Sequence, residues 1–225
     1  MDDQSTDQAV CGPADDLGGR IRRARTARGM SLRELAGRAG CSPSLVSQVE
    51  RGVTTPSARV VYALANELGI TLDSLFGAEN DAPVEHPGGT TNIAEIADAA
   101  SLWGRSTGPD GAGILQRADD RRTIDLSSGV RWERLTATHD AKVDFLKVVY
   151  APGGQSSESG QAVRHDGREY LYVLQGELEA TIGFDTLLLA EGDSLAFDPA
   201  TPHHYRNRTT EAVHALSVVV HPSGT

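Results

Sequence analysis

The chain has 225 residues and a formal net charge of −10, so it is long enough for two compact domains and, taken as a whole, too acidic to favour a nucleic-acid partner. Its two cysteines exclude a disulfide framework and a zinc site built from cysteines. Because no basic-then-apolar amino-terminal segment and no apolar run of membrane length occurs, we expect a cytoplasmic protein without a membrane partner.

The charge is distributed unevenly along the chain. Residues 1–16 are polar and acidic, and we expect them to form a disordered tail. Residues 17–77 carry nine arginines against four acidic residues, which gives this segment a net charge of +5 and leaves −15 for the rest. A basic module next to an acidic one predicts nucleic-acid binding by the first and a different task for the second.

Residues 17–77 are expected to form five short helices. Ser31 followed by Glu34 is a capping box, which begins a helix by satisfying backbone donors. Gly40 follows that helix, where a left-handed residue is favoured. Ser42 as N-cap and Pro43 in the first turn begin the next one. The expected helices are 17–28, 32–39, 43–51, 58–68 and 71–76.

The third of these helices turns Val46 and Val49 inward and leaves short hydrogen-bonding side chains outside. Such side chains on a second helix are suited to reading base edges in a major groove. The stretch 30–52, with its S-P-S-x-x-S-Q-x-E-R-G run, resembles the helix-turn-helix of the XRE family of phage-repressor-like regulators, and the resemblance extends over residues 17–77. A helical hairpin that serves only for packing is the alternative.

The resemblance implies binding to a double-stranded DNA operator. The candidates for the DNA-binding surface are outward-facing residues whose side chains can contact phosphate or base edges. Candidates for phosphate are Arg22, Arg25, Arg33, Thr54 and Thr55, candidates for base edges are Ser44, Ser47 and Gln48, and Ser42 and Arg51 complete the set.

Residues 78–113 are rich in glycine and proline and are predicted to be a linker. Within it, Thr91 to Trp103 has the apolar spacing of an amphipathic helix. Two roles are open for this helix: covering an edge of the following domain, or packing on a partner chain.

From about Ile114 the apolar period changes to the alternation of strands. Short alternating segments are separated by turns of glycine, proline and aspartate, which predicts a β-sandwich or barrel over residues 114–225. The expected strands are 143–150, 169–174, 177–182, 186–190, 193–197 and 213–220.

Two segments of this region, Val163–Gly176 and Glu191–Asn207, resemble the two sequence motifs of the cupin family. The first has a histidine, a glutamate four residues later and a glycine seven residues after that. The second has Gly-Asp, an apolar strand, Pro-His and an asparagine four residues beyond the histidine. The resemblance extends from about Ile114 to His221 and implies a cupin β-barrel, the double-stranded β-helix, with a metal between the motifs.

Carried over position by position, the family's ligands fall on His165, Glu169 and His203, whereas Val163 occupies the place of a further histidine. Along an extended strand, residues 163, 165 and 169 share one face, which would point into the barrel. Two histidines and one carboxylate suit a divalent metal such as Fe, Mn, Ni or Zn. The alternative is hydrogen bonding in the barrel core without a metal. The residues predicted to line an effector pocket at the barrel mouth are Arg164, Tyr172 and Asn207.

The expected fold class is multi-domain α plus β, with an amino-terminal five-helix lambda-repressor-like domain and a carboxy-terminal cupin β-barrel. This order resembles that of XRE-family regulators with a cupin sensor domain. The resemblance implies a homodimeric transcriptional regulator that responds to a small-molecule effector. We expect repression, with activation as the open alternative, and association with the nucleoid.

An enzyme with the same organisation is the alternative. The chain also resembles hydroxypropylphosphonate epoxidases, in which a helical domain precedes a cupin whose iron is held by two histidines and one glutamate. In that family a lysine of the helical domain reaches the active site, but the lysines here, Lys142 and Lys147, lie outside that domain. The positive charge and outward polar set of the helical domain therefore favour the regulator. A cupin isomerase fused to a helical bundle is a third interpretation, which the sequence supports less well.

Overall fold

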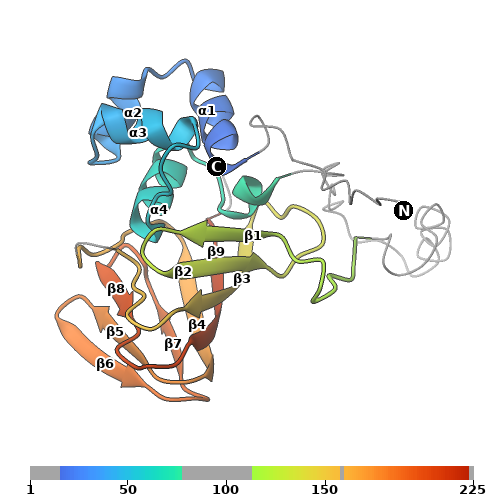
Figure 1. Cartoon of the computed structure of the whole chain (residues 1–225), viewed down its shortest axis with the longest axis vertical. Helices are drawn as coiled ribbons and strands as arrows, with labels where there is room; N and C mark the ends of the chain where they lie inside the picture. Colours follow the sequence, from blue (N-terminus) through green and yellow to red (C-terminus); the bar gives the residue numbers. More distant parts are fainter. Residues whose placement is uncertain (1–15, 78–112, 158–159, 223–225) are drawn as a thin grey trace, which may run out of the picture.

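The computed structural model describes residues 16–77, 113–157 and 160–222. It consists of a helical head above a β-barrel, with α4 on the side of the head next to the barrel (Figure 1). The head contains α1 (Leu17–Ala27), α2 (Leu32–Arg38), α3 (Pro43–Glu50), α4 (Ala58–Glu67) and the 3-10 helix η1 (Asp73–Phe76). The barrel contains β1 (Thr123–Leu126), β2 (Val130–Arg134), β3 (Val143–Tyr150), β4 (Arg168–Gln175), β5 (Leu178–Ile182), β6 (Asp185–Leu189), β7 (Ser194–Phe197), β8 (His203–Arg206) and β9 (Val213–Val220). None of the described helices is both long and apolar enough to cross a membrane.

The helices of the head begin where the capping residues predict. Ser31 Oγ accepts a hydrogen bond from Glu34 N while the Glu34 carboxylate accepts one from Ser31 N, so the capping box is confirmed. Ser42 Oγ accepts a hydrogen bond from Leu45 N at the start of α3, with Pro43 in the first turn. The helices enclose a small apolar core that contains Ile21, Leu35, Val46, Val49, Val61 and Leu64.

Two expectations about the head are corrected. The segment 71–76, expected to be a fifth α-helix, forms the four-residue helix η1, in which Leu75 N donates to Leu72 O three residues back. A turn this short closes only the tighter 3-10 hydrogen bond. Asp16, which we assigned to the tail, is the N-cap of α1 and accepts a hydrogen bond from Gly19 N at 2.7 Å. The rest of the tail and the helix expected at 91–103 lie outside the described residues.

The barrel consists of antiparallel strand pairs in a six-stranded sheet of order β1-β2-β3-β9-β4-β7 and a three-stranded sheet of order β6-β5-β8. The six predicted strands are confirmed, and β1, β2 and β8 are found in addition. Along β4, Glu169, Leu171 and Val173 are buried while Tyr170 and Tyr172 are exposed, as the alternation of a strand requires. The predicted fold class is therefore confirmed.

A buried polar cluster around Asp73, the first residue of η1, fixes the head to the barrel. The Asp73 carboxylate accepts hydrogen bonds from Thr136 Oγ1 (2.9 Å) and from Asp140 N (3.0 Å). It also pairs with His139 Nδ1 at 2.8 Å, and the buried guanidinium of Arg134 lies 3.6 Å away. These partners all belong to the barrel, so a residue of the head completes a polar cluster of the other domain.

Asp144 at the start of β3 makes the reciprocal contact. Its Oδ1 accepts a hydrogen bond from Asp73 N at 2.8 Å, and its Oδ2 lies 2.7 Å from His221 Nε2, just after β9. Two further backbone hydrogen bonds cross the junction, from Ser127 N to the carbonyl of Pro56 and from the second residue of α4 to the barrel. Head and barrel therefore pack as one unit.

The pairing of His221 with Asp144 predicts a pH-dependent contribution to stability. The hydrogen bond to Asp144 raises the pKa of His221 above its usual value, although partial burial opposes the shift. A histidine with a raised folded pKa adds stability that is complete below its unfolded pKa of about 6.5 and is lost as the pH rises through the raised pKa. We therefore expect the free energy of unfolding of wild type to exceed that of His221→Gln most at acidic pH, and the difference to shrink as the pH rises. Urea unfolding of both proteins across pH measures this difference, and a constant value would contradict the assignment.

Candidate functional site

The outer face of α3 carries a connected set of polar side chains. Gln48 Nε2 donates a hydrogen bond to Ser44 Oγ (3.2 Å), and Gln48 Oε1 accepts one from Thr54 Oγ1 (3.0 Å). The two hydroxyls hold the amide of Gln48 in one orientation. A glutamine presented from a helix in this way can pair with N6 and N7 of adenine. Thr54, predicted to contact phosphate, therefore contacts the predicted base-reading residue.

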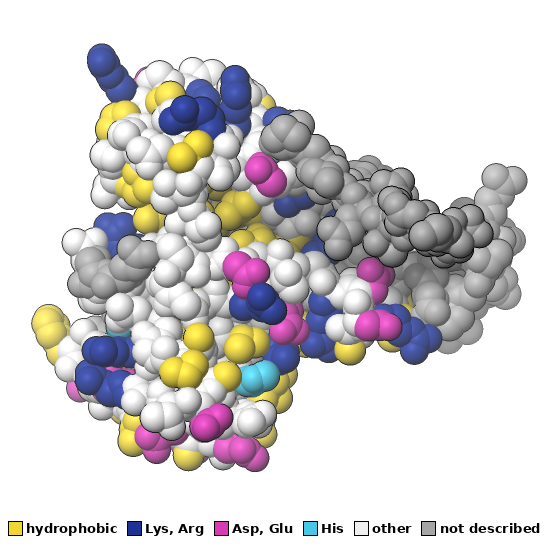
Figure 2. All heavy atoms as spheres, in the orientation of Figure 1, with side chains coloured by type: hydrophobic (Ala, Val, Ile, Leu, Met, Phe, Trp, Pro, Cys, Tyr) yellow, Lys and Arg dark blue, Asp and Glu magenta, His cyan; other side chains and the backbone are white. Residues whose placement is uncertain are grey.

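The arginines predicted at the DNA fall into two groups. Arg22, Arg33 and Arg51 are exposed, and Figure 2 shows arginine side chains gathered over the end of the head that lies away from the barrel. Arg25 instead donates to both oxygens of the buried Glu50 carboxylate, at 2.6 and 2.8 Å, and to a backbone carbonyl. Arg25, predicted to contact phosphate, thus joins α1 to α3, and its donors bind Glu50 and the backbone.

The three remaining residues of the predicted set have different surroundings. The hydroxyl of Ser42 caps α3 by accepting a hydrogen bond from Leu45 N, so Ser42 positions the reading helix. The carbonyl of Ser47 accepts a hydrogen bond from Arg51 Nε at 3.1 Å, next to Gln48 on the outer face. Thr55 is exposed just beyond α3. Ser47 and Thr55 stay candidates for contact with DNA.

A second group of predicted residues meets inside the barrel. His165, Glu169 and His203 are buried, and their ligand-type atoms all lie within 4.8 Å of one another. Glu169 Oε2 lies 3.0 Å from His165 Nε2 and 3.5 Å from His203 Nε2. Glu169 comes from β4 and His203 from β8, which belong to different sheets, while His165 precedes β4. Val163 is buried beside them and pairs with His203 through the backbone.

Backbone carbonyls orient the two histidine rings. His165 Nδ1 lies 3.1 Å from the carbonyl of Asp166, and His203 Nδ1 lies 3.0 Å from that of Thr201. Because a carbonyl only accepts, each Nδ1 donates its N–H to it, and each Nε2 faces Glu169. Two imidazole nitrogens and a carboxylate oxygen therefore converge on one point. Histidines that bind metals usually donate their second N–H in this way, so the donor set fits a divalent metal.

The surroundings of the site shift the pKa values of Glu169 and His203. Burial by itself raises the pKa of Glu169, but the hydrogen bond with His165 and the charges of both histidines together lower it below its usual value. Burial lowers the pKa of His203. Tyr205 OH donates to Glu169 Oε1 at 2.8 Å and orients the carboxylate. The adjoining cavity of about 20 Å³ has room for one ion or water.

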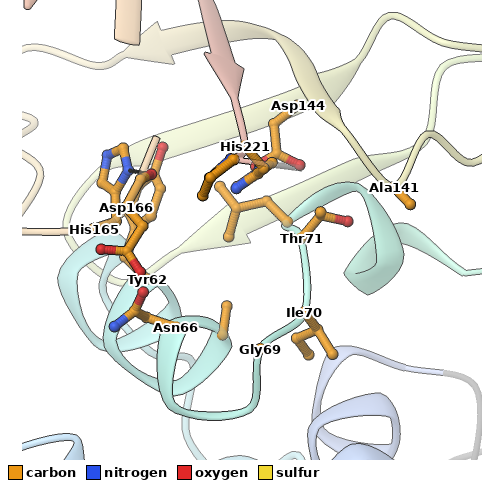
Figure 3. Close-up of a pocket in the computed structure, with 13 residues that line it drawn as sticks. Tyr62, Asn66, Gly69, Ile70, Thr71, Ala141, Asp144, His165, Asp166 and His221 are labelled. Atoms are coloured by element: carbon orange, nitrogen blue, oxygen red, sulfur yellow. Dashed lines mark hydrogen bonds and ion pairs between the residues drawn. The ribbon is translucent and has the colours of Figure 1, made fainter. Parts of the chain in front are cut away.

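Tyr62 reaches this site from the head. Its ring stacks on His165 with centroids 4.5 Å apart and planes 10° apart, and it meets Trp132 of β2 edge-on at 5.4 Å. Tyr62 and His165 also border a pocket of about 230 Å³ between the end of α4 and the barrel (Figure 3). The sequence analysis missed Tyr62 and Tyr205. Strand alternation from His203 would have placed Tyr205 inward, whereas no local pattern singles out Tyr62.

The structure does not bring the predicted effector residues together. Tyr172 is 44% exposed on the outer face of β4, because the strand turns its alternate residues inward. Asn207 is fully buried, and its amide donates to three backbone carbonyls at 2.7 to 3.1 Å, so it holds a loop. Arg164 is exposed beside His165. The effector pocket predicted from these three residues is therefore corrected.

Comparisons with known proteins agree with this arrangement. Residues 21–75 match the helix-turn-helix family and residues 146–219 match the cupin domain family. The chain is 23% identical over 200 residues to the HTH-type transcriptional regulator PuuR of Escherichia coli (strain K12), covering 89% of this chain and 92% of that protein. It is 43% identical over 61 residues to the HTH-type transcriptional regulator DdrOP3 of Deinococcus deserti, covering 27% of this chain and 47% of that protein. A crystal structure of an HTH_3 family transcriptional regulator from Vibrio cholerae has the same fold, with a TM-score of 0.55, 19% identity, and coverage of 92% of this chain and 96% of that one.

The fold and the two groups of residues define a two-domain protein in which a helix-turn-helix head precedes a cupin barrel. The chain carries an XRE-type helix-turn-helix domain followed by a cupin domain, and it is similar in sequence to HTH-type transcriptional regulators.

Proposed function

We propose that the protein is a homodimeric, sequence-specific transcriptional repressor associated with the nucleoid, and that its cupin domain binds a divalent metal ion or a small-molecule effector. The observation that carries the DNA-binding half of this proposal is Gln48, held between Ser44 and Thr54 on the outer face of α3. The name of the E. coli relative PuuR describes a transcriptional regulator, which supports the same role here.

The cupin half of the proposal rests on the three ligand-type atoms that converge in the barrel. His165, Glu169 and His203 would hold Fe, Mn, Ni or Zn, and a bound cation would neutralise the buried carboxylate. The cavity of about 20 Å³ beside these residues is far smaller than an organic substrate requires, which favours a sensor over an oxidase or epoxidase. The pocket of about 230 Å³ between head and barrel has room for a small organic effector.

We propose the outer face of the six-stranded sheet as the surface on which two chains pair. On this face Phe145, Val218 and Tyr170 form an apolar cross-strand row, and the next row consists of Lys147, Leu216 and Tyr172. Tyr170 and Tyr172 are 45% and 44% exposed. A second copy on this face would bury these rings and present two α3 helices to half-sites about 34–36 Å apart or a multiple of that.

Replacing Gln48 by alanine tests the base-reading role. We expect the affinity for the specific operator to fall about 5- to 150-fold, which corresponds to about 1–3 kcal/mol, with little change for random DNA. The reason is that a paired amide discriminates between bases, whereas phosphate contacts do not. Fluorescence anisotropy with an operator selected from random duplex DNA, beside a scrambled duplex, gives both affinities.

Two variants control this measurement. Gln175→Ala changes the same residue type at the exposed end of β4 and should bind the operator like wild type. Arg33→Ala removes an exposed arginine of α2 and should weaken binding to both duplexes alike, with a salt slope reduced by about 1. If Gln48→Ala lost affinity equally for operator and scrambled DNA, base reading by Gln48 would be refuted.

A further inference from the structure

We propose that Tyr62 transmits the occupancy of the His165–Glu169–His203 site to the DNA-binding head, an inference that rests on the metal and DNA binding proposed above. Tyr62 belongs to α4 of the head, yet its ring stacks on His165 at a centroid distance of 4.5 Å. A histidine that would hold the metal is therefore supported by a side chain of the other domain.

Helix α4 connects this contact to the helix-turn-helix through α2, which packs on both α4 and the reading helix α3. Val61 and Leu64 of α4 are fully buried in the core of the head, which they share with Val46 of α3. Val61 and Tyr62 are neighbours in sequence, so one helix presents one side chain to the core of the head and the next to the barrel site, and this helix packs against α2, the partner of α3 in the helix-turn-helix. Because packed helices shift as bodies, a displacement of Tyr62 is passed to the head.

A second path joins the other side of the site to the start of α4. Tyr205 OH donates to Glu169 Oε1 at 2.8 Å, and Tyr205 N donates to Ser156 Oγ at 3.0 Å. Ser156 O in turn accepts a hydrogen bond from Arg59 N at 2.9 Å, and Arg59 is the second residue of α4. Two of the three candidate ligands are thus connected to the same helix of the head, one through its ring and one through hydrogen bonds.

The pocket beside Tyr62 gives its ring a second place to lie. Figure 3 shows Tyr62, Asn66 and Thr71 of the head facing His165 and Asp166 of the barrel around this space of about 230 Å³. When His165 is held by coordination instead of by its contact with Glu169, the support of the Tyr62 ring changes. Tyr62 then has two arrangements, stacked on His165 or turned into the pocket. Linkage requires that operator DNA alters metal affinity by the same factor as metal alters DNA affinity.

The test compares operator affinity of metal-free and metal-saturated protein, with Fe(II), Mn(II), Ni(II) or Zn(II) added alone and saturation followed by calorimetry. For wild type we expect metal to change the operator affinity by at least about fivefold. Tyr62→Phe keeps the ring and should show the same ratio. Tyr62→Leu keeps an apolar side chain but cannot stack, and its ratio should fall below about twofold. His203→Ala, a variant of a candidate ligand, should show no metal effect.

The outcomes separate this inference from the proposed function. A wild-type protein that binds metal with unchanged operator affinity would overturn the inference and leave the metal site standing. A wild-type protein that binds no metal would overturn both the inference and the proposed metal site. A Tyr62→Leu ratio equal to that of wild type would also overturn the role of Tyr62. Should that variant fail to fold, the fluorescence of Trp132 can be measured in a Trp103→Phe variant, where it is the remaining tryptophan. Trp132 contacts Tyr62 edge-on, so its emission reports on the position of Tyr62. Emission unchanged by metal saturation would count against the proposal.

Discussion

Purified protein carrying His203→Ala is expected to retain no divalent metal, whereas wild type should retain a single ion per chain at the one cluster of ligand-type residues found among the described residues. Even partners that only hydrogen-bond to metal ligands are typically worth about 10- to 100-fold in affinity, so the loss of a direct ligand should cost more. Metal analysis after incubation with Fe(II), Mn(II), Ni(II) or Zn(II) and dialysis measures the content.

The neighbouring residues supply matched controls for the metal measurement. His204→Ala changes the next histidine, which strand alternation turns away from Glu169, and should leave the metal content unchanged. Tyr205→Phe removes the hydrogen bond that orients Glu169 and should lower metal affinity about 10- to 100-fold without emptying the site at saturation. Equal metal content in wild type and His203→Ala would show that the three residues serve the barrel core alone.

Replacing Asp73 by alanine is expected to destabilise the chain by about 3–5 kcal/mol. The change removes a fully buried carboxylate that lies 3.6 Å from the guanidinium of Arg134, itself 1% exposed. A buried charge that loses its counter-charge keeps its desolvation cost. The change also removes an acceptor from Thr136, His139 and Asp140 N, which lie across the junction between head and barrel. Guanidinium chloride unfolding measures the loss, and limited proteolysis should cut between head and barrel faster than in wild type.

An exposed ion pair of the barrel is the control for Asp73. Arg131 donates to Asp125 at 2.6 Å, but the two side chains are 53% and 66% exposed, so water screens the pair. Asp125→Ala should therefore change stability by only about 0–1 kcal/mol. Asp73→Asn keeps the shape without the charge and should fall between the two. Similar losses for Asp73→Ala and Asp125→Ala would contradict a structural role of the buried cluster.

The features that sequence analysis placed correctly depend on residues close together in the chain. Ser31 and Glu34 cap α2 because the two lie within one helical turn. The strand around Glu169 follows from alternation over eight residues. The motif spacing also named His165, Glu169 and His203 as a group, although two sheets supply them. In the first two cases the residues of the pattern and of the contact are close together in the sequence. In the third case the contact joins distant segments, and the family resemblance supplied it.

The errors have a common physical origin in contacts between distant segments. Arg25 is predicted to be exposed to DNA like other arginines of the head, but its ion pair with Glu50 of another helix holds its side chain inward. Tyr172 belongs to a suitable motif, but the direction of the strand places it outside. The sequence analysis made no prediction for Asp73, because only the packing of the head on the barrel buries it among polar groups.

The sequence alone predicted the order of a helical and a β domain, because periodicity and caps express interactions along the chain, and the resemblance to the cupin motifs supplied the triad. The structure was needed to show that α4 covers the triad with Tyr62 and that η1 inserts Asp73 into the barrel. Those contacts arise from the way two folded surfaces meet. That meeting depends on the shape and charge of both surfaces at once, which no short stretch of residues contains.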